Sequence, residues 1–137
     1  MKLSAGSEYG LKALADLALN LKDKPVSVAS IAERQNIPLK YLELVFSSLR
    51  RAGLVRSLQG TGGGYILARP AAEIRLSEIL KVLEGDLSIV EEEAGDSNAE
   101  SLCRCIKENV WDVVSGRIYD VLDSMSLQDL IDNKCEA

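Results

Sequence analysis

Apolar and polar positions alternate at helical spacing over the first third of the chain. Across residues 7–21 the apolar side chains recur every three or four positions, which predicts a helix that Ser7 caps and that stops before Pro25. A second, shorter helix is expected after Ser27, because serine is a preferred N-cap residue. Asn36 is expected to end that helix in the left-handed conformation.

A third helix follows directly. Pro38 suits the first position of a helix and Gly53 suits a helix exit, so residues 38–53 are predicted to form one element. Its buried stripe consists of the apolar side chains at positions 42, 45, 46 and 49, and its opposite face is polar. Two helices joined by a tight polar turn have the layout of a helix-turn-helix.

A segment with four glycines in five residues lies between two β-prone runs, residues 54–58 and 65–68. A phosphate-binding glycine loop leads from a strand into a helix, whereas these glycines join one strand to the next. We therefore expect a hairpin whose tip uses positive φ angles at positions 60, 62, 63 and 64. Three helices followed by a hairpin make a winged helix. The glycines of this wing either approach DNA closely or serve only the turn.

Three further segments follow the hairpin. Residues 74–85 are predicted to form a helix that Gly85 closes. The acidic stretch 86–98 has no periodicity and indicates a loop. At the end of the chain, Ser126 and Asp129 form a Ser-x-x-Asp capping pattern, which predicts a short last helix.

Between the acidic loop and the last helix, residues 99–125 are predicted to form a long amphipathic helix. Its apolar stripe runs for about six turns at 3.6 residues per turn, more than a small winged helix needs to cover its core. We expect this stripe to be the seam of a homodimer, and the alternative is that it packs only against its own domain. The seam residues are Leu102, Ile106, Val110, Val114, Ile118 and Val121.

Composition narrows the function. The chain of 137 residues has no histidine, the commonest general base, and we find no paired-carboxylate or nucleophile motif, so an enzyme is not expected. No segment is apolar enough to span a membrane and no secretory signal is visible, so we expect a cytoplasmic protein. Residues 1–72 carry ten Lys or Arg against five Asp or Glu, whereas residues 73–137 carry six against sixteen. The predicted helix-turn-helix and wing therefore lie in a basic half, which suits nucleic acid.

The predicted fold class is mainly α with a small β-hairpin wing, a winged helix-turn-helix followed by a long C-terminal dimerisation helix. We divide the chain into a DNA-binding domain (residues 1–85), an acidic sensor loop (86–98), and a dimerisation helix with a short last helix (99–137). Two function classes fit this fold. One is a sequence-specific transcription regulator, and the other is a winged helix used only for protein–protein contact.

The motifs YGLKAL, IAERQNIPLKYLE, LRRAGLV, GGGYILAR and LSEILKVLEG resemble the Rrf-two family of bacterial winged-helix transcription regulators. The resemblance covers most of the chain, and GGGY after the GLV strand is its most specific part. It implies a homodimer, with repression as the expected mode of regulation, that binds a pseudo-palindromic double-stranded DNA operator. The third helix would enter the major groove and the wing the adjacent minor groove.

The resemblance also implies DNA-contacting positions. Glu43 matches a recognition-helix glutamate, whose carboxylate can accept a hydrogen bond from cytosine N4. Lys40, Arg50 and Arg51 are expected to contact phosphate, and Gln59 stands where a relative has arginine, which should weaken minor-groove capture. The full set of expected contacts is Lys40, Tyr41, Glu43, Ser47, Arg50, Arg51, Arg56, Gln59, Gly60, Gly62 and Gly63.

Cluster-binding members of this family hold iron and sulfide on three cysteines before the long helix. Here only Cys105 falls on such a position, so the standard ligand set is absent and the cofactor stays unknown. A cluster on Glu8 of the partner subunit, Cys103, Cys105 and Cys135 is one hypothesis. A thiol redox or small-ligand sensor is the second, and control by a regulatory partner protein is the third.

Overall fold

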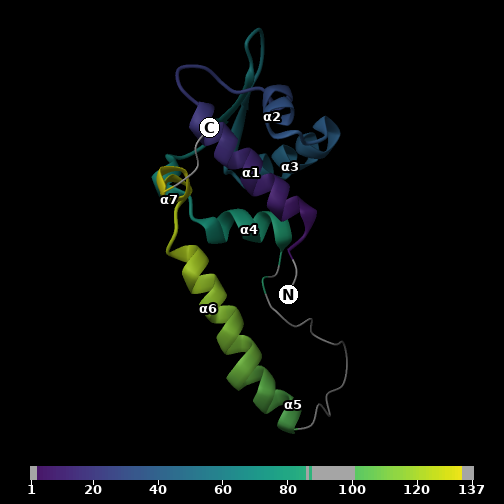
Figure 1. Cartoon of the computed structure of the whole chain (residues 1–137), viewed down its shortest axis with the longest axis vertical. Helices are drawn as coiled ribbons and strands as arrows, with labels where there is room; N and C mark the ends of the chain where they lie inside the picture. The colour runs from purple at the N-terminus through teal and green to yellow at the C-terminus, as the bar shows by residue number, and fades with distance from the viewer. Residues whose placement is uncertain (1–2, 86, 88–100, 134–137) are drawn as a thin grey trace.

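The computed structural model describes residues 3–85, 87 and 101–133. In Figure 1 the helices α1 to α4 and the β-hairpin form a compact part, and the helix that contains α5 and α6 extends away from it. The elements are α1 (Ala5–Asn20), α2 (Val28–Gln35), α3 (Leu39–Arg51), β1 (Val55–Leu58), β2 (Gly64–Leu67), the 3-10 turn η1 (Ala71–Glu73), α4 (Leu76–Glu84), α5 (Ser101–Ile106), the π-helical turn η2 (Lys107–Trp111), α6 (Asp112–Asp123) and α7 (Leu127–Asn133).

The helix-turn-helix has the predicted caps. The Ser27 side chain accepts a hydrogen bond from the backbone N–H of Ser30 at 3.1 Å, and Asn36 leaves α2 with φ of 54°. The predicted cap of the first helix is wrong. Ser4 caps α1, because its backbone is extended and its hydroxyl accepts from the N–H of Ser7, which is itself buried inside the helix. Pro38 lies just before α3 rather than in it.

The wing is a two-stranded antiparallel hairpin in which Val55 pairs with Leu67 and Leu58 pairs with Gly64. Only Gly60 and Gly62 have positive φ in the tip, so this prediction is wrong for positions 63 and 64. These two glycines are required for close approach. A side chain at Gly63 would meet the Leu58 carbonyl oxygen, and one at Gly64 would meet the backbone of Val26.

One core joins the helices and the base of the hairpin. Its fully buried side chains are contributed by α1, α2, α3, β1, α4 and α7, and they include Phe46 and Leu127. Leu127 comes from the last helix, which returns to the first part of the chain. The backbone N–H of Leu127 donates to the Ile74 carbonyl at 2.8 Å, and the predicted Ser126–Asp129 capping pair is present. The C-terminal segment thus completes the core of the winged helix.

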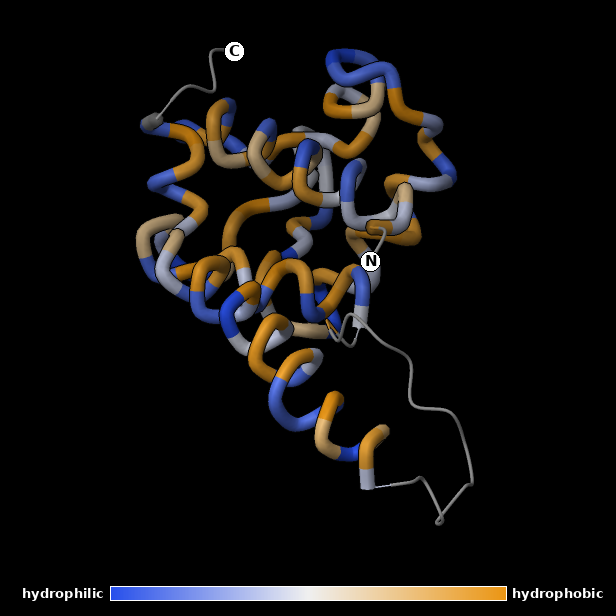
Figure 2. The backbone as a smooth tube through the Cα atoms, turned by 60° about the horizontal axis from the view of Figure 1, so that its bottom comes forward, coloured by the Kyte–Doolittle hydropathy of each residue, from blue (hydrophilic) through white to orange (hydrophobic). Residues whose placement is uncertain are grey.

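Residues 101–123 form one long helix, and its middle segment is the π-helical turn η2. The apolar periodicity did not predict this turn. Hydrophobic residues recur along its projecting part, where no other described element covers them (Figure 2). Leu102 is 66% exposed and Val121 is 59% exposed, whereas Ile118 is half-buried. The stripe predicted as a dimer seam therefore faces solvent in the single chain, except at Ile118. None of the helices in the described part of the chain is long and apolar enough to cross a membrane.

Candidate DNA-binding surface

Helix α3 has one buried and one exposed face. The buried face carries Leu42, Val45, Phe46 and Leu49, as predicted. The exposed face carries Lys40, Glu43, Leu44, Arg50 and Arg51, and Ser47 is half-buried beside it. The polar side chains that the sequence singled out on this helix therefore stand together on a free surface. Leu44 was not singled out.

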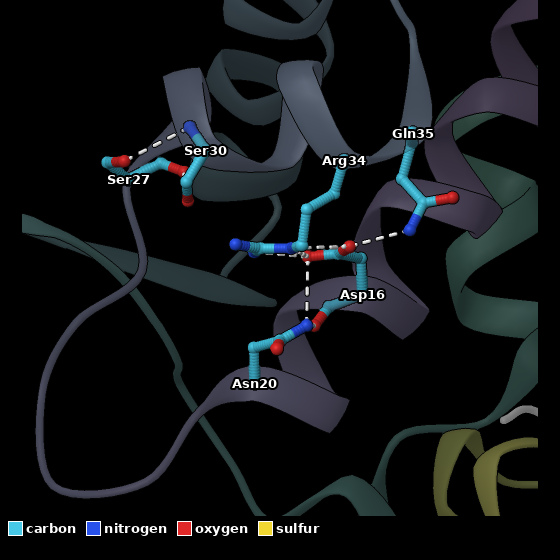
Figure 3. Close-up of polar contacts among 6 residues, drawn as sticks. All are labelled: Asp16, Asn20, Ser27, Ser30, Arg34 and Gln35. Atoms are coloured by element: carbon cyan, nitrogen blue, oxygen red, sulfur yellow. Dashed lines mark hydrogen bonds and ion pairs between the residues drawn. The ribbon is translucent and has the colours of Figure 1, made fainter. Parts of the chain in front are cut away.

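A buried carboxylate holds α2 against α1. The side chain of Asp16 is only 1% exposed, and its oxygens accept hydrogen bonds from Arg34 at 2.6 Å and from Gln35 at 2.6 Å (Figure 3). Asn20 donates to the same carboxylate at 3.3 Å. The hydrogen bond to Asp16 raises the pKa of the Arg34 guanidinium. Because α3 begins four residues after Gln35, this cluster sets where the helix-turn-helix lies on α1.

The sequence contained a signal for this cluster. Asp16 lies among Ala13, Leu14 and Leu17 on the inward face of the first helix, and a charged residue at such a position needs a buried partner. The partner could not be assigned because Arg34 is 18 residues away along the chain.

Tyr41 connects α3 to the first turns of α1. Its ring is half-buried and meets the ring of Tyr9 edge to face, with centroids 5.4 Å apart. A side chain at Gly6 would lie 2.9 Å from the Tyr41 hydroxyl, so the tyrosine would have to shift to make room for it. Tyr41 therefore has a clear packing role, and its contact with DNA stays a prediction.

The wing carries its polar groups on the outside. Arg56 and Gln59 are exposed, as are Gly60 and Gly62 at the tip. The N–H of Gly63 donates to the carbonyl of Gly60 at 2.9 Å, so this N–H group closes the turn. At the wing tip, a large ligand can therefore approach the backbone at the exposed glycines 60 and 62.

Glu84 ties the end of α4 to the start of α1. Its carboxylate accepts hydrogen bonds from the Ser7 hydroxyl, from the Ser4 hydroxyl at 2.8 Å and from the Ser4 backbone N–H at 3.0 Å. These bonds, the one from Ser7 first, lower the pKa of Glu84. No local pattern in the sequence indicates this contact, because Ser4 and Glu84 are 80 residues apart.

The cysteines do not form a metal site in the described part of one chain. Cys103 and Cys105 are both exposed and both lie inside α5, so their side chains point about 200° apart around the helix. Glu8 is exposed in the first turn of α1, and Cys135 lies outside the described residues. Among the residues described, no three His, Cys, Asp or Glu side chains are grouped to hold a metal ion.

A model of the Rrf2 (Rrf-two) family, described as iron-dependent transcriptional regulators, matches residues 3–133. The chain belongs to the Rrf2 family.

Individual relatives support the assignment to the Rrf2 family. The transcriptional regulator IscR of Cereibacter sphaeroides is 43% identical over 138 residues, which covers 98% of this chain and 89% of the relative. The solved structure of CymR, the global cysteine regulator of B. subtilis, superposes with a TM-score of 0.81 at 36% identity and covers 98% and 99% of the two chains. The T. potens IscR structure gives 0.77 at 36% identity and covers 100% and 94%.

Family membership confirms the winged-helix fold and makes the chain a DNA-binding transcriptional regulator rather than an enzyme. Of the two classes that the sequence left open, the DNA-binding regulator is therefore the one supported.

Proposed function

We propose that this Rrf2 protein is a homodimeric, sequence-specific repressor. In this proposal α3 enters the major groove of each operator half-site, and the wing reaches the adjacent minor groove. Repression then follows from occupancy, because a dimer that covers both grooves of a promoter excludes other proteins from it.

The observation that carries the proposal is the exposed apolar stripe on the helix 101–123. Monomeric proteins rarely leave a long row of aliphatic side chains in water, so a row of this length supports a protein partner. A second copy of the same chain is the simplest partner, since antiparallel or crossing copies of one amphipathic helix cover each other. The exposed members of the row are Leu102, Ile106, Val110, Val113, Val114 and Val121.

A dimer and a specific operator are tested together. Gel-shift titrations with genomic fragments at two salt concentrations should reveal a few fragments bound tightly, with affinity falling steeply as salt rises. Sedimentation of the free protein at micromolar concentration should give twice the chain mass. A reporter gene behind a bound fragment should be less expressed when the protein is present. Uniform binding to all fragments would overturn sequence specificity, and a monomer in sedimentation would overturn the dimer. Activation of the reporter would overturn repression.

For the signal, we propose thiol chemistry at Cys103 and Cys105. Their exposure supports it, since an accessible cysteine can be modified or oxidised. The side chain of Asn109 lies 3.4 Å from the Cys105 sulfur and donates to it. Protein purified without oxygen should be colourless and should lose operator affinity when these thiols are alkylated. A brown protein that contains both iron and sulfide would overturn this proposal in favour of a cluster.

A further inference from the structure

Leu44 stands out on the exposed face of α3. It is 71% exposed, more than any other large apolar side chain in the described part of the chain. Three of its four neighbours one turn away on the helix surface are polar, and the fourth is Tyr41, whose ring packs on Tyr9 of α1; the polar three are Lys40, Ser47 and Ser48. The backbone carbonyl of Leu44 accepts a hydrogen bond from the Ser48 hydroxyl at 3.3 Å, and this bond does not involve the leucine side chain. At this exposure the isobutyl group gains little from the fold.

Its surroundings indicate what kind of surface would cover it. The same face carries Lys40, Arg50 and Arg51, which suit a polyanion. Glu43 is the adjacent residue, and its carboxylate is expected to accept a hydrogen bond from a base edge. A helix that presents these groups to the major groove brings Leu44 to the base edges as well.

The major groove offers a leucine one apolar partner. Each base edge displays hydrogen-bond donors and acceptors, and only thymine adds a methyl group, at C5. We propose that Leu44 is a specificity-determining residue that packs on the C5-methyl group of a thymine, next to the base pair that Glu43 reads. This inference rests on the proposed function, because it needs α3 in the major groove.

The physical basis is desolvation of two apolar groups by each other. The leucine is mostly exposed and the thymine methyl faces the open groove before binding, so the contact removes apolar surface of both groups from water. A guanine, adenine or cytosine at that position would place a polar base edge against the leucine. The donors and acceptors of that edge would then be left without hydrogen-bond partners. Leu44 would therefore select thymine partly by attraction and partly by exclusion of the other bases.

The test starts from a random double-stranded DNA pool. Selection with the wild-type protein should enrich one duplex family, with a thymine preferred at a defined position in each half-site. Selection with Leu44→Ala should lose that preference and keep the one that Glu43 sets. Leu44→Met, which stays apolar, should keep the thymine. Because Leu44 is exposed, the thermal unfolding midpoints of both variants should stay close to that of the wild type.

A cycle of paired substitutions then isolates the contact. Replacing the selected thymine by uracil removes only the methyl group, and it should weaken wild-type binding about fourfold, the factor for one buried methyl-sized group. The same replacement should have no effect on Leu44→Ala. Leu39→Ala is the matched control, because Leu39 is exposed at the start of α3 but lies about 140° around the helix from Leu44. It should keep the wild-type response to uracil.

The outcomes separate the two proposals. If the wild-type protein enriches no duplex family, specific operator binding itself fails. If it enriches one, but Leu44→Ala enriches the same sequence and uracil weakens both proteins equally, the role of Leu44 is overturned and the regulator stands. The role of Leu44 would also be overturned if Leu44→Ala enriches the same sequence as the wild type but no longer binds a protein partner that the wild type binds.

Discussion

At the scale of single residues, α3 combines side chains with opposite effects on DNA. Arg50, Arg51 and Lys40 attract phosphate whatever the sequence, whereas the carboxylate of Glu43 is repelled by it. A glutamate on such a surface lowers general affinity unless a base offers it a donor. Affinity and specificity on this helix are therefore expected to depend on different residues.

Changing Glu43 to Ala should leave binding to random DNA equal or stronger, because a repulsive charge is removed. The variant should lose about 1–3 kcal/mol of discrimination at one base pair per half-site, the range for a lost base contact. Binding-site selection run on both proteins measures this. An unchanged base preference at every operator position would mean that Glu43 does not meet a base.

Changing Arg50 or Arg51 to Ala should weaken binding to all DNA sequences alike. Each lost phosphate contact should flatten the slope of log affinity against log salt by about one unit. Titrations of operator and random duplexes over a range of salt concentrations measure both effects. If discrimination collapses while the slope is constant, the arginine reads a base and the phosphate assignment is wrong.

At the scale of elements, two polar contacts hold helices in place. Asp16 fastens the end of α2 to α1, and Glu84 fastens the end of α4 to the start of α1. The first is buried and the second is at the surface, so they should respond differently to substitution and to pH. Both act on α1, the helix against which Tyr41 of α3 also packs.

Removing the Asp16 charge with Asp16→Asn should destabilise the fold by about 2–4 kcal/mol, because the amide cannot satisfy the donors of Arg34 and Gln35. We expect a smaller loss of stability than for a fully buried ion pair, since the Arg34 side chain is 39% exposed. Urea denaturation measures the free energy of unfolding. Glu33→Gln, an exposed change in α2 beside Arg34, should stay within about 0.5 kcal/mol of the wild type. Equal stability of all three proteins would contradict a structural role for Asp16.

Glu84 predicts a dependence on pH. Its folded-state pKa is lowered from the ordinary value of 4.5, so its stabilising effect is present above that value and is lost as pH falls through the folded-state pKa. The free energy of unfolding should therefore fall less steeply below pH 4.5 in Glu84→Gln than in the wild type. Ser7→Ala, which removes the first hydrogen bond to this carboxylate, should also flatten the curve. Parallel curves for the three proteins would contradict this account.

At the scale of the whole molecule, the projecting helix and the compact part have different surfaces. The compact part buries its apolar residues around Phe46 and Leu14, whereas the helix 101–123 leaves most of its own exposed. Helix α3 and the hairpin lie at the end of the molecule opposite α5 (Figure 1). Pairing through the helix would therefore leave α3 and the wing of each copy free.

A charge on the exposed stripe tests this pairing. Val121→Lys should shift the protein toward monomer at micromolar concentration, because burial of an unpaired ammonium group at a helix seam is costly. Operator affinity should fall with it, since a bipartite site needs two copies. Tyr119→Lys is the matched control, because Tyr119 is 45% exposed in α6 but lies about 200° around the helix from Val121. Sedimentation that gives dimers for both variants would contradict the proposed seam.

The sequence alone determined the features that depend on neighbours along the chain. The caps at Ser27 and Ser126, the left-handed exit at Asn36 and the buried stripe of α3 were all predicted, because each is set within about four residues. The hairpin followed from β-prone runs around glycines. The basic face of α3 could be predicted too, since a stripe that buries one side of a helix leaves the other side exposed.

Only the tertiary structure decided the rest. The partners of Asp16 and Glu84, the burial of Leu127, and the exposure of Leu44 all depend on segments that are distant in sequence. Gly64 is a glycine because the backbone of Val26 passes close to it, which no local pattern encodes. Periodicity indicates which side of a helix is apolar, but it does not indicate what covers that side. The fold supplied a cover for Leu127 and left Leu44 in solvent, because only packing in three dimensions determines which apolar groups leave water.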